Sequence, residues 1–256
     1  MKRLSAPGFW EVKKKEKKYV ITPSSGPHRS QACIPLTIML RDILKIAENT
    51  SEVKQILAAG NVKVNGKVRR DKKFPVGLMD IVEVGEKYHR VLVGNKGLKL
   101  YEIKKRDALS LIQIKNKTYV KRKGKTGLYL QLNMHNGNNM LVDNTKDYTT
   151  GDVLVMKDGK VSDVLPFTKN ALGLIIEGHN IGTIGSVESI IVKRASLKNE
   201  VILNVTNNGK SEKLLVPKNY VFIIGKEQTD AKGVKTLKPI IDIQVNNNAV
   251  NGGKND

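Results

Sequence analysis

The sequence contains one cysteine, Cys33, in 256 residues, and it has no long apolar run. A single cysteine excludes a disulfide framework, and without a second cysteine nearby a zinc ribbon, zinc knuckle or redox CxxC site is excluded too. No stretch approaches the roughly 18 consecutive apolar residues of a membrane-spanning helix, and the first residues lack the apolar core of a signal peptide. We therefore expect a soluble protein of the reducing cytoplasm.

Acidic and aromatic residues are scarce as well. Asp and Glu number 24 against 45 Lys and Arg, which gives a formal net charge of +21. The positive charge is spread along the whole chain and predicts a long contact with an acidic partner, for which nucleic acid is the best candidate. An anionic membrane is disfavoured, because we find neither a basic amphipathic helix nor a lipidation motif. Aromatic residues make up 5% of the chain, which favours several small aliphatic cores over one large core.

Motifs for nucleotide binding and catalysis are incomplete. Lys123-Gly124-Lys125-Thr126 ends like a phosphate-binding loop, but Tyr119 occupies the position of the required first glycine. Residues 178–185 carry only the last glycine spacing of a dinucleotide fingerprint, and a strand is expected to follow them. The four histidines lie far apart without metal-binding spacing, and several acidic residues fall in expected turns. We therefore expect no catalytic residues, no metal site and no cofactor.

The two ends of the chain differ from its middle. Residues 1–34 show no sustained helical or strand period and combine a lysine-rich run at 13–18 with turn-forming Pro and Gly, which indicates an extended basic arm. Phe9, Trp10 and Tyr19 could anchor this arm on the body or stack on bases. The end of the chain, residues 244–256, is rich in Asn and Gly and is expected to be disordered.

A pair of helices and a hairpin are expected next. Apolar residues recur at helical spacing over 36–47 and predict an amphipathic helix. A second helix should begin at the Asn49 cap, with Glu52 three residues on, and end at Gly60. Its buried residues should be Val53, Ile56 and Leu57. Asn65-Gly66, between alternating apolar residues, predicts a hairpin because both positions tolerate positive φ.

Short strands dominate the rest of the chain. Beyond a strand at 81–84, strands are expected at 90–93, 98–101, 128–132, 140–142 and 153–156, with a hairpin turn at 94–97. After a break near Pro166, five more strands at 172–177, 184–192, 200–205, 213–216 and 220–224 fit a small barrel. The predicted fold class is therefore α+β and mostly β.

Basic residues cluster at expected loops beside rigid elements, which is where phosphate-binding side chains are useful. Ordinary solvated charge remains the alternative for some of them, as a plain surface position does for His28. The predicted RNA-binding residues are Lys13, Lys14, Lys15, Lys17, Lys18, His28, Arg29, Arg41, Lys45, Lys67, Arg69, Arg70, Lys72, Lys73, Lys121, Arg122, Lys123, Lys125, Asn180, Gly182 and Gly185.

Several blocks of the sequence resemble one known family. In order, these are Lys2-Arg3-Leu4-Ser5-Ala6-Pro7, then Pro23-Ser24-Ser25-Gly26-Pro27-His28, then Ile34-Pro35-Leu36 with Leu40-Arg41-Asp42, then Gly66 to Asp80. Together they are similar to the archaeal and eukaryotic small-subunit ribosomal protein family S4e. Later stretches agree, among them Tyr148-Thr149-Thr150-Gly151-Asp152 and Val221-Phe222-Ile223-Ile224-Gly225. The resemblance covers about residues 2–226. The N-terminus resembles those of archaeal members, and the composition is rich in Lys and Asn and poor in Arg, which suggests an archaeal source.

The resemblance implies an organisation and a role. The implied parts are an N-terminal arm at 1–34, an S4-type RNA-binding domain at 35–88, a central β-domain at 89–165, a KOW-type SH3-like barrel at 166–226 and a C-terminal extension at 227–256. The implied role is that of a structural, non-catalytic constituent of the small ribosomal subunit. Its partners would be small-subunit ribosomal RNA and neighbouring ribosomal proteins in the cytoplasmic ribosome, with no membrane and no homo-oligomer.

One position departs from the family pattern. KOW loops commonly carry a basic residue beside the central glycine, but Ile181 and Thr183 flank Gly182 here, so a charge-assisted phosphate contact is not expected. Asn180 and the backbone N–H groups of Gly182 and Gly185 could still approach RNA. Alternatively, the two glycines could simply form a tight barrel turn.

Two other functions fit parts of the sequence. S4-type modules are also appended to pseudouridine synthases, in which an Asp of a large catalytic domain is the nucleophile, but the chain beyond residue 90 predicts small β-modules instead. A KOW-containing transcription or translation factor is the other alternative, and its low abundance on ribosomes would distinguish it.

Overall fold

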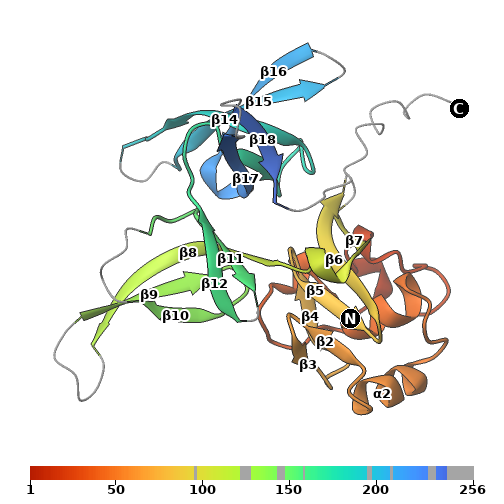
Figure 1. Cartoon of the computed structure of the whole chain (residues 1–256). Helices are drawn as coiled ribbons and strands as arrows, with labels where there is room; N and C mark the ends of the chain where they lie inside the picture. The colour runs from red at the N-terminus through yellow and green to blue at the C-terminus, as the bar shows by residue number, and fades with distance from the viewer. Residues whose placement is uncertain are drawn as a thin grey trace, which may run out of the picture. The chain divides into compact units, whose positions relative to one another are not determined.

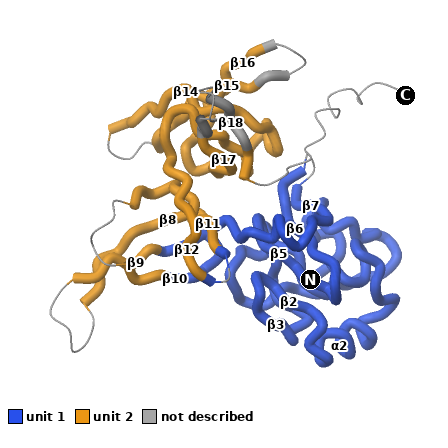
Figure 2. Tube along the Cα trace, viewed as in Figure 1, with its two compact units in different colours: residues 1–112, 133–139, 157–159 blue, residues 113–132, 140–156, 160–256 orange. Residues whose placement is uncertain are grey.

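The computed structural model describes residues 1–94, 97–121, 128–142, 148–157, 159–194, 198–207, 210–229 and 235–240. The chain divides into two compact units (Figure 2). Unit 1 contains residues 1–112, 133–139 and 157–159, and unit 2 contains residues 113–132, 140–156 and 160–256. Within the described ranges, no helix is long and apolar enough to cross a membrane. The predicted disordered end, residues 244–256, lies outside the described residues.

Unit 1 is built around a five-stranded antiparallel sheet (Figure 1). Its order is β3-β2-β5-β6-β7, with bounds Lys67–Val68, Val62–Val64, Ile81–Val84, Lys87–Gly94 and Gly97–Ile103. A second, two-stranded sheet pairs β1 (Cys33–Pro35) with β4 (Pro75–Gly77). The boundary predicted between residues 88 and 89 falls inside β6, which hydrogen-bonds to β5, so β6 and β7 continue the sheet of unit 1.

The first predicted helix is shorter and wider than its hydrophobic pattern indicates. Helix α1 (Leu36–Ile38) runs directly into a π-helical turn, η4 (Met39–Ile43). Within it the N–H of Leu44 donates to the carbonyl of Met39. A wide turn of this kind adds a residue to the helical repeat. The buried face is therefore concentrated at its start, where Leu36, Ile38, Met39 and Leu40 are fully buried.

Helix α2 (Thr50–Ala58) begins where the sequence predicts. Asn49 Oδ1 accepts hydrogen bonds from the backbone N–H groups of Ser51 and Glu52 at 2.9 and 3.0 Å, which satisfies two of the unpaired donors at a helix start. Val53 and Leu57 are fully buried, and Ile56 is half-buried. The cap is thus confirmed, and so are two of the three predicted buried residues.

The Asn-Gly hairpin turn predicted in unit 1 is confirmed as well. Asn65 and Gly66 have φ angles of 50° and 75° between β2 and β3, which is the conformation that an Asn-Gly turn needs. Strands β6 and β7 pair as far as Gly94 and Gly97, and residues 95 and 96 of the other predicted turn lie outside the described residues.

The N-terminal segment, residues 1–32, is folded back on itself instead of extended. Its short 3-10 helices are η1 (Arg3–Ser5), η2 (Gly8–Trp10) and η3 (Ser30–Ala32). The backbone N–H of Arg3 donates to the carbonyl of Lys18, and that of Val20 donates to the carbonyl of Met1. Trp10 is fully buried and its indole donates to the carbonyl of Cys33 at 2.8 Å. Burying this large ring fastens the segment to the body of unit 1.

The central sheet has the strand order β10-β9-β8-β11-β12. The bounds are Asn139–Val142, Leu128–Met134, Ser110–Lys121, Val153–Lys157 and Lys160–Leu165, and the 3-10 turn η5 (Lys105–Asp107) precedes β8. Strands β8 and β12 were not predicted from the sequence. The outer half of β8 carries no apolar alternation that would have revealed a strand.

The C-terminal sheet has six strands in the order β16-β15-β14-β13-β17-β18. The bounds are Lys210–Pro217, Glu200–Asn207, Ile184–Ile191, Leu172–Ile175, Val221–Thr229 and Lys235–Pro239, and the 3-10 turn η6 (Lys218–Tyr220) precedes β17. Five of these strands fall where they were predicted, and β18 is additional. Val221, Phe222, Ile223 and Ile224 are fully buried in consecutive positions, so β17 is covered on both faces.

Candidate nucleic-acid interface

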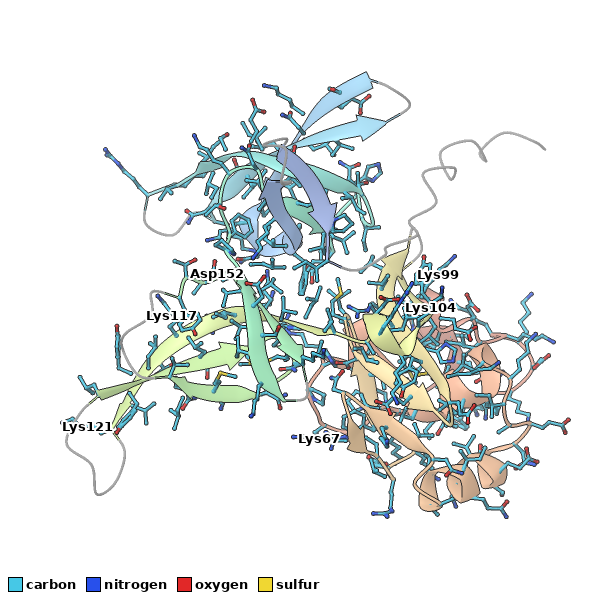
Figure 3. The ribbon with its side chains drawn as sticks, in the orientation of Figure 1. Lys67, Lys99, Lys104, Lys117, Lys121 and Asp152 are labelled. Carbon is cyan, nitrogen blue, oxygen red and sulfur yellow. The ribbon has the colours of Figure 1, made fainter. Side chains whose placement is uncertain are left out.

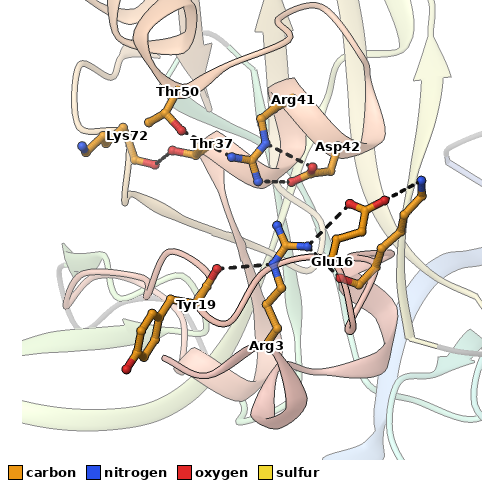
Figure 4. A network of polar contacts seen from close by, with 9 residues as sticks. Arg3, Glu16, Tyr19, Thr37, Arg41, Asp42, Thr50 and Lys72 are labelled. Carbon is orange, nitrogen blue, oxygen red and sulfur yellow. Dashed lines mark hydrogen bonds and ion pairs between the residues drawn. The ribbon is translucent and has the colours of Figure 1, made fainter.

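The loop at residues 67–73, here called the basic loop, is held in place by polar contacts with its neighbours. Asp71 accepts hydrogen bonds from the N–H of Lys73 and the hydroxyl of Ser24 at 2.9 and 2.8 Å. The carbonyl of Lys72 accepts from the hydroxyl of Thr37 at 2.7 Å (Figure 4). A loop fixed in this way presents its charges with little ordering entropy left to lose on binding.

Three cations of the basic loop point to solvent. Lys67, Arg70 and Lys73 are exposed, and Lys72 is half-buried. Arg69 differs from them, because its guanidinium carbon lies 4.3 Å from the centre of the Phe74 ring. This stacking makes Arg69 part of the packing of the loop. The basic loop therefore offers three outward positive charges on an ordered backbone, which is the arrangement that a phosphate-binding surface requires.

The lysine run at residues 13–18 is exposed throughout. Lys13 and Glu16 form an ion pair at 2.8 Å, and this hydrogen bond raises the pKa of Lys13 and lowers that of Glu16. Arg3 is almost fully buried and donates to the carbonyl of Lys13 at 2.7 Å. It also donates to the carbonyl of Tyr19 at 3.3 Å (Figure 4). Arg3 thus fixes the backbone on both sides of the exposed lysines.

A cavity of about 570 Å³ brings Lys17, Arg41 and Lys45 together. Arg41 is bound to Asp42 at 2.7 Å and to the hydroxyl of Thr50 at 3.3 Å (Figure 4). The cavity is also lined by Arg3 and by three carboxylates, those of Glu16, Asp42 and Glu48. Its positive charge is therefore largely compensated, and the basic loop is the stronger surface for an anion.

His28 lies inside unit 1, whereas its neighbour Arg29 is exposed. The His28 side chain is 7% exposed, and its Nε2 lies 2.8 Å from Oδ2 of Asp80. Asp80 also accepts hydrogen bonds from the side chain of Asn65 at 2.7 Å and from the N–H of Gly77 at 2.9 Å. The structure thus gives His28 a role in packing, and its ring is not available for a phosphate.

In the C-terminal sheet, Asn180 is exposed, but the two predicted glycines serve the fold. The N–H of Gly182, at a φ of 85°, donates to the carbonyl of Ile175 at 2.8 Å and is not free for RNA. A Cβ on Gly185 would lie 2.8 Å from the carbonyl oxygen of Asn204 on the neighbouring strand. Of the two readings of these glycines, the geometry favours a tight turn and a close strand approach.

The remaining predicted cations belong to the β8–β9 connection. Lys121 is exposed at the end of β8, while Arg122, Lys123 and Lys125 lie outside the described residues. Two further groups of exposed cations were not among the RNA-binding residues predicted from the sequence. One is Lys104, Lys105 and Arg106 around η5, and the other is Lys115 and Lys117 on β8. The density of positive charge in the sequence could have identified the first group. The second group could not be identified without knowing that residues 110–121 form a strand.

Among the described residues, the two buried carboxylates, those of Asp80 and Asp152, are fully committed to the fold. Asp80 is held as described above. Asp152 accepts from the N–H and the hydroxyl of Thr149, both at 2.7 Å, and from the N–H of Phe167 at 2.8 Å. Among the described residues, no cluster of three or more His, Cys, Asp or Glu side chains could hold a metal ion. A carboxylate that accepts several backbone hydrogen bonds is a structural anchor.

Comparison with known proteins gives consistent matches along the chain. Residues 1–31 match the RS4NT (NUC023) domain, residues 40–82 the S4 domain and residues 84–159 the Ribosomal family S4e. The small ribosomal subunit protein eS4 of Methanothermobacter thermautotrophicus is 39% identical over 236 residues, which is 90% of this chain and 93% of the relative. That of Archaeoglobus fulgidus is 38% identical over 248 residues, 95% of this chain and 97% of the relative.

A solved structure supports the same relationship. The crystal structure of the 30S ribosomal protein S4e from Thermoplasma acidophilum matches with a TM-score of 0.62 and 29% sequence identity. The match covers 76% of this chain and 96% of the other.

Proposed function

The chain belongs to the ribosomal family S4e, and from this premise we propose that it is a structural constituent of the small ribosomal subunit that binds ribosomal RNA. The observation that carries the proposal is the ordered basic loop, which lies within the residues that match the S4 domain. Lys67, Arg70 and Lys73 stand on a backbone fixed by Asp71 and Thr37.

The proposed binding mode is phosphate neutralisation by several modules at once. The lysine run, the basic loop with Arg29, and Lys121 would each contact RNA, and each would raise the effective concentration of the others. Arg41, Lys45 and Lys72 would contribute within unit 1, and Asn180 would contribute separately within unit 2. His28, Arg69, Gly182 and Gly185 would support the surfaces from within the fold. Specificity would come from the shape of folded RNA instead of from base edges alone.

The proposed organisation keeps the order of the five parts inferred from the sequence, but the first part is folded onto unit 1 instead of extended. Residues 166–226 would form the KOW-type SH3-like barrel, which is supported by five of the six strands of the C-terminal sheet. The S4-type module would extend beyond residue 88, because β6 and β7 are hydrogen-bonded to its sheet. Neighbouring small-subunit proteins would be further partners.

A catalytic role finds no support in the described residues. A pseudouridine synthase needs an Asp whose carboxylate can reach a base, whereas the buried Asp80 and Asp152 are saturated by internal hydrogen bonds. The comparisons likewise name ribosomal proteins.

Direct RNA binding by the full chain tests the proposal. The purified protein is titrated with small-subunit ribosomal RNA between 50 and 200 mM salt, with transfer RNA as competitor. With about 6 to 10 phosphate contacts, affinity should fall by about 10³- to 10⁵-fold over this range. Ribosomal RNA should also outcompete transfer RNA. Binding that is insensitive to salt, or equal for the two RNAs, would contradict the proposal.

A further inference from the structure

Strand β8 changes character halfway along its length. Its first half is buried on both faces, at Leu111, Ile112, Gln113 and Ile114. From Lys115 to Lys121 every residue is exposed except Val120, which is half-buried. The outer half of β8, residues 115–121, therefore extends beyond the core of its sheet with both faces accessible.

The two faces of this outer half differ in chemistry. Because successive strand residues point to opposite faces, one face carries Asn116, Thr118 and Val120. The other face carries a set that we call the basic strip, namely Lys115, Lys117, Tyr119 and Lys121. No acidic residue occurs in β8. One face is thus neutral, while the other combines three cations with an aromatic ring.

Tyr119 is the unusual member of the basic strip. It is 61% exposed and stands between Lys117 and Lys121 on the same face. Among the described residues, its side chain has no hydrogen-bond or ring partner. A solvated charged face has no need of an exposed aromatic ring, whereas unpaired bases stack on such rings regardless of sequence.

The lysines on either side of Tyr119 are placed to contact a nucleic-acid backbone. Lys117 Nζ donates to the carbonyl of Tyr148 at 2.6 Å, which uses one of its three donors and fixes the ammonium group. Lys121 is exposed at the outer end of β8, as Figure 3 shows. Lys117 and Lys121 are four residues apart, so they lie about 13 Å from each other along the strand. This span leaves room for one base stacked on Tyr119 with a phosphate on each side of it.

We propose that the basic strip binds an unpaired segment of RNA, with one base stacked on Tyr119 and the adjacent phosphates on Lys117 and Lys121. The proposal rests on the proposed function and names a contact outside the S4-matched region. A fully paired RNA helix would present no base face to the ring. An acidic peptide would satisfy the lysines but would leave the aromatic ring without a matching partner.

The test compares variants of the full chain in binding to small-subunit ribosomal RNA. Tyr119→Ala removes the ring, Tyr119→Phe keeps it, and Asn116→Ala is the matched control on the opposite face of the same strand. Tyr119→Ala should weaken binding about fivefold or more, the loss of one stacked base, while the other two should bind within about twofold of wild type. Lys121→Gln should lower the salt slope by about 0.7 to 0.9.

Ultraviolet cross-linking of the wild-type complex at 254 nm, read out by peptide mass spectrometry, gives a second measurement. A nucleotide attached within residues 115–121 supports the proposal. Wild-type affinity for Tyr119→Ala, or nucleotides attached to the chain but none within residues 115–121, would overturn it while leaving the proposed function intact. If the wild-type chain itself does not bind ribosomal RNA, the proposed function fails first.

Discussion

His28 Nε2 lies 2.8 Å from Oδ2 of Asp80, joining two residues that are 52 positions apart in the sequence. The carboxylate can only accept hydrogen bonds, so the imidazole donates. The same Asp80 holds the side chain of Asn65, at the turn that leads into the basic loop. This contact fastens the N-terminal segment to the S4-matched sheet and places both beside the loop that we propose binds RNA.

Removing the imidazole should destabilise the protein. His28→Ala leaves a buried carboxylate oxygen with one partner fewer and opens space in the packing, which should cost about 1–3 kcal/mol in the free energy of unfolding. Urea unfolding of the purified chain measures this loss. The exposed neighbour variant Arg29→Ala is the control and should unfold like wild type. Equal stability of the two variants would show that the His28–Asp80 contact carries no weight.

A methyl group at Gly185 should disturb the C-terminal sheet. The added Cβ would lie 2.8 Å from the Asn204 carbonyl oxygen and 2.8 Å from a methyl carbon of Val205, closer than packed atoms tolerate. Gly185→Ala should therefore lower the free energy of unfolding by about 1–3 kcal/mol. Gly8→Ala, where nothing lies within 4 Å, is the control. A stable Gly185→Ala protein that had lost RNA affinity would instead revive direct RNA contact by this glycine.

Cys33 should be unreactive in the folded protein. It is fully buried, and burial raises the pKa of its thiol to about 11 from a usual value of 9.0. At pH 8 the native thiol should therefore resist iodoacetamide, whereas the chain in concentrated urea should react quickly. Because the folded pKa lies above the unfolded one, the thiol's contribution to stability is lost as pH rises from about 9 to 11. Equal labelling rates in buffer and in urea would show that Cys33 is accessible.

Reversing the charge of the basic loop should weaken RNA binding without unfolding the protein. The triple variant Lys67→Glu, Arg70→Glu, Lys73→Glu changes only exposed side chains. It spares Arg69, which packs on Phe74. Affinity for small-subunit ribosomal RNA at 100 mM salt should fall by at least 100-fold, on the order of three lost phosphate contacts.

The matched control makes the same change of charge elsewhere. Lys160→Glu, Lys169→Glu, Lys198→Glu alters three exposed lysines of unit 2. A smaller loss of affinity in this control, with unchanged thermal unfolding in both variants, assigns the effect to the basic loop. An equal loss in both variants would mean that only net charge matters.

Local rules predicted the elements whose cause is local. The Asn49 cap and the Asn65-Gly66 turn depend on side chains and φ preferences within a few residues, and both are present as predicted. Helix α1 gives way to a π-helical turn in which Met39 and Leu40 are fully buried, and the regular 3.6-residue repeat does not predict this turn.

Distant partners explain most of what the sequence did not reveal. The sequence predicts an extended arm for the N-terminal segment, because the burial of Trp10 and its hydrogen bond to the carbonyl of Cys33 depend on the tertiary structure. The sequence predicts that His28 is a loop residue, because its partner Asp80 lies 52 positions further along the chain. The outer half of β8 was not predicted as a strand, because neither of its faces is buried and its sequence is therefore polar. In the first two cases the deciding neighbour lies elsewhere in the chain, and in the third the strand has no buried face that a sequence pattern could reveal.

The central claim is that this chain is a stoichiometric part of the small ribosomal subunit, held there by charge. Sedimentation of a lysate of the source organism through a sucrose gradient, with quantitative protein counting in the small-subunit peak after stepwise salt washes, tests it directly. The account predicts about one copy per small subunit, released only at high salt. A sparse protein that washes off at low salt and stays mainly in the free fractions would contradict it.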